Sequence, residues 1–64
     1  MPKYRVTLLP AGLEYITEAR PEWNDEGRTV AFCGGRVGNK ERKLFLIALG
    51  DNDTVIIETD AKDA

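Results

Sequence analysis

The sequence predicts a small, mostly β domain in which about five antiparallel strands form a curled sheet or barrel. Three observations predict this fold: segments that alternate apolar and polar residues, turn-forming sequences between them, and a C-terminal region that is apolar on both faces. At 64 residues the chain has room for one domain, which we expect to span residues 1–64 with a polar tail from about residue 60.

Residues 3–9 predict the first strand, because polar and apolar residues alternate along them. Its apolar face consists of Tyr4, Val6 and Leu8. Pro10 and Gly12 predict a turn directly after this strand, since proline fixes φ and glycine accepts a positive φ.

Residues 13–19 are compatible with two structures. Their alternation favours a second strand, whereas Leu13 and Ile16 also have the spacing of a short helix over residues 12–20. Pro21 would end such a helix, and a helix of this length is marginal in water. The strand is the favoured alternative, and the short helix remains open.

One loop is predicted before a short central strand and a second loop after it. Residues 21–27 are polar and rich in turn-forming residues, and residues 34–42 contain three glycines among charged residues. Between them, residues 28–33 place Val30 and Phe32 on one face.

The segment from Lys43 to Thr59 predicts a hairpin that is apolar on both faces. A turn over residues 50–53 would pair its two strands and group four apolar side chains on one face. A chain of this size has little interior, so either a barrel encloses both faces or one face contacts another molecule. We therefore predict an interface, with a protein partner or in a homo-oligomer, that consists of Phe45, Ile47, Leu49 and Ile56.

Charge is unevenly distributed along the chain, although the net charge is only −2. Residues 28–43 carry five basic residues against one glutamate, and residues 44–64 carry five acidic residues against one lysine. A basic loop with glycines can bind phosphate, or its charges can simply pair with the acidic segment. The candidate nucleic-acid contacts are Arg36, Lys40, Arg42 and Lys43.

Trp23 is a further candidate binding residue, because it lies in a polar loop. A loop tryptophan can anchor an interface, or it can fold back as a lid over a small core. Both alternatives remain open for Trp23.

The residue types present argue against catalysis. The chain has no histidine, and Cys33 is its single cysteine, which excludes an internal disulfide and argues against a zinc site. Cys33 is expected to be buried and inert, because no imidazole is available to activate it. We therefore predict no catalytic residues, no metal and no cofactor.

One enzymatic alternative rests on the N-terminus. Removal of Met1 would leave Pro2 as the terminal residue directly before a strand, and in this opening and in its length the chain resembles a 4-oxalocrotonate tautomerase subunit. The resemblance implies an oligomeric enzyme with Pro2 as its base. That family has a long helix before its second strand, a region that Pro21 and Gly27 interrupt here.

The leading hypothesis is an accessory or inhibitory protein that acts by binding a protein partner or itself. The alternative is a small β-barrel that binds nucleic acid through residues 28–43. No run reaches the length of a transmembrane helix, and the first ten residues lack the apolar region of a signal peptide. We therefore expect no membrane association and a cytoplasmic location.

Overall fold

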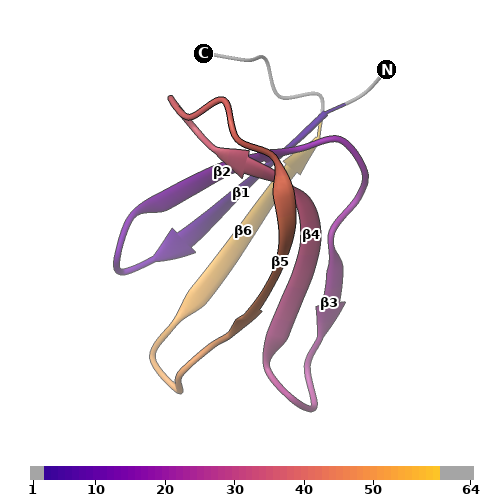
Figure 1. Cartoon of the computed structure of the whole chain (residues 1–64). Helices are drawn as coiled ribbons and strands as arrows, with labels where there is room; N and C mark the ends of the chain where they lie inside the picture. The colour runs from indigo at the N-terminus through magenta and orange to yellow at the C-terminus, as the bar shows by residue number, and fades with distance from the viewer. Residues whose placement is uncertain (1–2, 60–64) are drawn as a thin grey trace.

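The computed structural model describes residues 3–59, and within that range the chain forms six strands and no helix. The strands are β1 (Tyr4–Leu9), β2 (Leu13–Thr17), β3 (Glu22–Asn24), β4 (Thr29–Arg36), β5 (Lys43–Ala48) and β6 (Thr54–Thr59). All pairings are antiparallel, and the strands form one strongly curled sheet (Figure 1). The predicted mostly β fold is confirmed, and a strand, not a short helix, occupies the 12–20 region.

β4 is the strand that joins the two halves of the sheet. One of its edges pairs with β5, and the other pairs first with β3 and then, beyond its midpoint, with β2. β1 lies between β2 and β6, so the chain's first strand is paired with its last. Figure 1 shows β4 bending along its length, which turns the two halves toward each other.

The predicted C-terminal hairpin is wrong. β5 pairs with β4, which places Phe45 opposite Phe32, and β6 pairs with β1, which places Ile56 opposite Thr7. Although a short loop joins β5 to β6, no Cα of one lies within 8 Å of a Cα of the other. The curled sheet is therefore open between these two strands.

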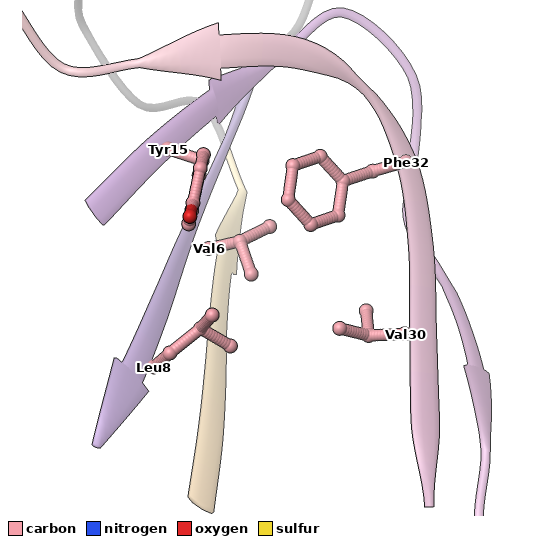
Figure 2. Close-up of a cluster of buried hydrophobic side chains, with 5 residues drawn as sticks. All are labelled: Val6, Leu8, Tyr15, Val30 and Phe32. Atoms are coloured by element: carbon pink, nitrogen blue, oxygen red, sulfur yellow. The ribbon is translucent and has the colours of Figure 1, made fainter. Parts of the chain in front are cut away.

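The core fills the inner face of the curled sheet (Figure 2). Its fully or nearly fully buried members are Val6, Leu8, Tyr15, Val30 and Phe32. The apolar faces predicted for residues 3–9 and 28–33 are therefore confirmed. Three rings from different strands meet there: Tyr15 and Phe45 have centroids 4.9 Å apart, and each lies 5.1 Å from Phe32. These contacts join β2 to the β4–β5 pair across the interior.

Two predicted loops contain strand residues. Residues 34–36 continue β4, and residues 22–24 form the short edge strand β3. At Gly34 the backbones of β2 and β4 approach so closely that an added Cβ would clash with the Ile16 carbonyl and lie 2.9 Å from the Thr17 Cα. Gly34 is therefore required because two paired strands approach closely, and Gly35 is required because the Glu41 backbone of the following loop lies against it.

The turn after β1 has the predicted form. Gly12 has a φ of +78°, and its amide donates a 2.8 Å hydrogen bond to the Leu8 carbonyl. The Leu9–Pro10 peptide bond is cis. Space around Gly12 is open, so only its backbone conformation restricts the residue there.

Replacement of Gly34 by alanine should destabilise the fold more than replacement of Gly12. Gly34→Ala forces β2 and β4 apart, which we expect to cost about 3 kcal/mol or more. Gly12→Ala only imposes a left-handed backbone on an L-residue, at about 1 to 2 kcal/mol. Urea unfolding of both variants measures the difference. An equal loss of stability would mean that β2 and β4 do not depend on this close approach.

Candidate functional site

The outer face of β5 carries the most exposed large apolar side chains among residues 3–59. Leu44 is 77% exposed and Leu46 is 74% exposed. They lie opposite Cys33 and Ala31 of β4, on the face that points away from the core. On its other edge, within the described residues, β5 has no paired strand. β5 therefore offers both an apolar outer face and free backbone groups.

The four residues of the predicted interface lie on two different faces. Phe45, Ile47 and Leu49 are half-buried and pack against the chain's own core. Ile56 is 43% exposed on the outer face of β6. The expected grouping assumed the hairpin pairing, which does not form. The exposed pair, Leu44 and Leu46, lay on the other apolar face of the same segment, and only the pairing with β4 distinguishes the two faces.

Trp23 lies on the edge strand β3 and is 38% exposed. Its indole N–H donates a hydrogen bond to the carboxylate of Asp25. With Ala31 and Leu46, Trp23 lines an open groove of about 670 Å³ whose rim includes acidic side chains. The indole thus lies beside the exposed face of β5, and the interpretation as a lid over the core is not supported.

Three of the four predicted basic residues line one cleft. Arg36, Lys40 and Arg42 surround a volume of about 260 Å³, together with Ile16 and residues 37–39. The cleft lies where the loop from β4 to β5 passes β2, and this loop buries Ile16 on the outer face of the sheet. Lys43 is not part of the cleft; its ammonium lies 5.3 Å from the centroid of the Phe45 ring.

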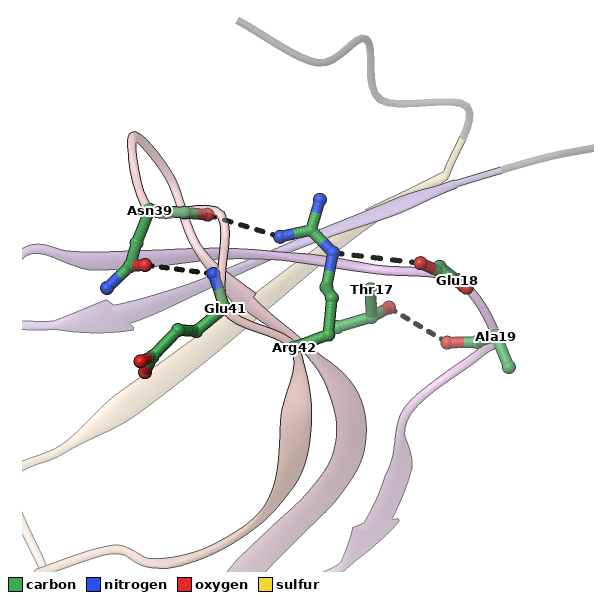
Figure 3. Close-up of polar contacts among 6 residues, drawn as sticks. All are labelled: Thr17, Glu18, Ala19, Asn39, Glu41 and Arg42. Atoms are coloured by element: carbon green, nitrogen blue, oxygen red, sulfur yellow. Dashed lines mark hydrogen bonds and ion pairs between the residues drawn. The ribbon is translucent and has the colours of Figure 1, made fainter.

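Hydrogen bonds shape the loop that carries the cleft (Figure 3). The Asn39 side chain accepts a 2.9 Å bond from the Glu41 amide, and the Asn39 carbonyl accepts a 3.2 Å bond from Arg42. Arg42 also lies 3.6 Å from the carboxylate of Glu18. Within residues 3–59, neither Arg36 nor Lys40 has an acidic partner. The cleft therefore presents two uncompensated positive charges and one that is paired.

Arg28, the first basic residue of the 28–43 segment, has a structural role. Its guanidinium donates hydrogen bonds to the carbonyls of Gly50 and Asp53, and its own carbonyl accepts a 2.7 Å bond from the Leu49 amide. Its φ of +46° places it at the tight turn before β4. Arg28 thus joins this turn to the β5–β6 loop and does not contribute to the cleft.

The prediction that Cys33 is buried is wrong. Cys33 is exposed on the outer face of β4, because strand alternation points it away from the core that its neighbour Phe32 enters, and its cross-strand neighbour is the exposed Leu44. Residues 3–59 contain no cluster of three or more potential metal ligands. Pro2 and the predicted polar tail lie outside the described residues.

No helix among the described residues is long and apolar enough to cross a membrane. No protein-family model, curated protein or solved structure matches this chain. Two surfaces of the described residues are candidate binding sites: the outer face and free edge of β5, and the basic cleft of the β4–β5 loop.

Replacement of Arg28 should destabilise the fold, because it leaves the carbonyls of Gly50 and Asp53 without their donor. We expect Arg28→Gln to lose about 1.5 to 3 kcal/mol of unfolding free energy, the range for hydrogen bonds from charged groups. Arg36→Gln is the matched control, since Arg36 is exposed and unpaired among the described residues. Urea unfolding tests both variants, and similar midpoints would contradict a structural role for Arg28.

Proposed function

We propose that this protein is a non-catalytic interaction module, an accessory or inhibitory protein that acts by binding and that forms homo-oligomers. The observation that carries the proposal is the exposure of Leu44 and Leu46 on an edge strand. Burial of their exposed surface in an interface would contribute roughly 1 to 2 kcal/mol for each side chain. Two such leucines on one short strand are costly to leave in water unless they contact another molecule.

The free edge of β5 supports the same proposal. Natural edge strands are usually blocked by prolines, bulges or charged side chains, because open backbone groups pair readily with other strands. β5 has no proline, and its only charged residue is Lys43 at its first position. An extended segment could therefore add to this edge through main-chain hydrogen bonds while its side chains cover the leucines.

The non-catalytic part of the proposal is supported by residue types and placement. The chain has no histidine, and the described carboxylates do not form a cluster with cysteine or with one another. The two candidate surfaces are an exposed apolar face and a basic cleft, which fit binding better than proton transfer. The single free thiol fits a reducing cytoplasm, where we place the protein.

Charged residues at the two leucine positions should abolish partner binding without unfolding the protein. Leu44→Lys and Leu46→Lys add charge at exposed positions, so circular dichroism and thermal stability should stay close to those of the original chain. Glu14→Gln, at an exposed position outside the groove that Trp23 lines, changes the net charge by the same +1 and serves as the charge-matched control.

The measurement is capture of partners on the immobilised protein, followed by binding assays with purified components. We expect one stoichiometric partner that is retained by the control and lost with either leucine variant. A partner bound equally well by Leu46→Lys would show that β5 is not the docking surface.

The basic cleft supports a second candidate function, nucleic-acid binding. Arg36 and Lys40 have no acidic partner among the described residues, and together with Arg42 they surround one cleft. A phosphate placed there would contact three positive charges, and each neutralised phosphate releases counterions. This candidate ranks second because the chain offers no exposed aromatic residue at the cleft on which a base could stack.

If the cleft binds nucleic acid, affinity for a short single-stranded oligonucleotide should fall steeply with salt concentration. Replacement of Arg36, Lys40 and Arg42 by glutamine should then abolish binding and flatten the salt dependence, by roughly 0.7 in slope for each lost phosphate contact. Arg20→Gln removes an exposed charge outside the cleft and should bind normally. Fluorescence anisotropy across a salt series measures both effects, and unchanged affinity in the triple variant would rule out this site.

A further inference from the structure

The two ends of β5 carry opposite charge. Lys40, Arg42 and Lys43 lead into the strand, with Glu41 as the only acidic residue among them. Asp51 and Asp53 follow it in the loop toward β6, where Arg28, bound to the Gly50 and Asp53 carbonyls, contributes one positive charge against their two negative charges. Between these ends the outer face is apolar and neutral, with Leu44, Leu46 and Ala48 exposed. The free edge of β5 is therefore an apolar strip with a basic start and an acidic end.

An edge of this kind is complementary to an inverted copy of itself. In an antiparallel pair of identical strands, the start of each lies beside the end of the other, so basic meets acidic at both ends. A parallel pair would place basic beside basic and acidic beside acidic. Exposed charges interact over roughly 8 to 10 Å at physiological ionic strength, so these end groups affect the choice of orientation.

The free edge of β6 lacks this property, and β3, the third edge strand of the described residues, is only 3 residues long. β6 follows Asp53 and contains Glu58 near its end, so it is acidic at both ends. Two β6 edges would repel, and a β5 edge paired with a β6 edge would bring opposite charges together at one end only. Such a mixed contact is also heterologous, and heterologous contacts close only into rings or extend without limit.

We infer that the partner of β5 is a second copy of this chain, bound by antiparallel pairing of the two β5 edges. The inference rests on the proposed interaction function and names its partner. Directly opposed residues in an antiparallel pair share a face, so the two-fold axis passes through Phe45 or Leu46. With Phe45 on the axis, Leu44 lies opposite the partner's Leu46; with Leu46 on the axis, Leu46 meets its own copy and Leu44 lies opposite the partner's Ala48. Either register covers the exposed leucines and extends one sheet across both subunits. The half-buried Phe45 and Ile47 then meet the partner's inner face.

Sedimentation equilibrium tests the inference on the intact protein. We expect a species of twice the 7.1 kDa chain mass that dissociates on dilution. Leu46→Lys should weaken dimerisation by about tenfold or more, since it places two charges at the apolar centre of the interface. Ile56→Lys makes the same change on the outer face of β6 and should leave the dimer intact. Circular dichroism checks that both variants fold.

A charge exchange provides a second test that does not depend on the leucines. Lys43→Glu and Asp51→Lys should each raise the dissociation constant about threefold, because each places like charges at both ends of the paired strands. The combined variant restores opposite charges across the interface and should recover the affinity of the original chain. Failure of the double variant to recover, with all variants folded, would overturn the antiparallel arrangement.

Cross-linking locates the interface. In a Cys33→Ser background, a mixture of Leu44→Cys and Leu46→Cys chains should form intersubunit disulfides on oxidation, because Leu44 opposes the partner's Leu46 when Phe45 lies on the axis and Leu46 opposes its own copy when Leu46 lies on the axis. Ile56→Cys should not. A chain that stays monomeric at high concentration, or a dimer that cross-links only through position 56, would overturn the inference. The proposed interaction function is tested separately. It would be contradicted if every purified partner bound the original chain and Leu46→Lys equally well.

Discussion

The close approach of β2 and β4 at Gly34 is the constraint on which the other features of the structure depend. With no side chain at this position, the last residues of β4 can pair with β2 while its first six residues pair with β5. This shared strand brings Phe32 beside both Tyr15 and Phe45, so a 64-residue chain assembles one continuous core. A sheet this small gains most of its burial from curling, since a flat sheet would leave one side of every strand without cover.

The same arrangement determines which surfaces remain for binding. β5 contributes Phe45 and Ile47 to the interior, and the alternation of a strand then forces Leu44 and Leu46 outward. β6 returns to β1 and leaves the edge of β5 without a neighbour in the described chain. Beyond Gly35, the connection to β5 folds over Ile16 and gathers the cationic side chains into the cleft. Both candidate surfaces therefore result from the pairing of β4, which has β5 on one edge and β3 and β2 on the other.

Local sequence patterns predicted the parts of the fold that depend on local structure. Alternation along residues 3–9 and 28–33 identified Val6, Leu8, Val30 and Phe32 as core residues, and Pro10 with Gly12 identified the turn. The prediction of strand pairing failed because pairing depends on residues far apart in sequence. The turn sequence at 50–53 favours a hairpin of β5 with β6, but β5 pairs with β4 and β6 pairs with β1. Gly34 and Gly35 were assigned to a loop because glycine is typical of loops. The structure requires glycine at both positions because another part of the backbone lies against each, and the local sequence does not show such a contact.

The same limit explains the candidate site. Grouping the four cations of residues 36–43 needed only their closeness in sequence, and three of the four do share a cleft. Choosing between the two apolar faces of residues 43–49 needed the identity of the neighbouring strand, which sequence alone did not provide. The exposure of Cys33 follows from the same pairing, since its cross-strand neighbour is Leu44.

The pairing of β1 with β6 has a consequence for how the chain reaches its native state. The two strands are far apart in sequence, so pairing them closes a large loop. The chain loses the conformational entropy of that loop before the contacts between the strands can stabilise it. Proteins dominated by such distant pairings fold slowly, on a scale of about milliseconds to seconds. During synthesis, β1 has its final neighbour only after residue 59 has emerged, and until then its edge can pair with other chains. Newly made protein is thus the form most exposed to misassembly.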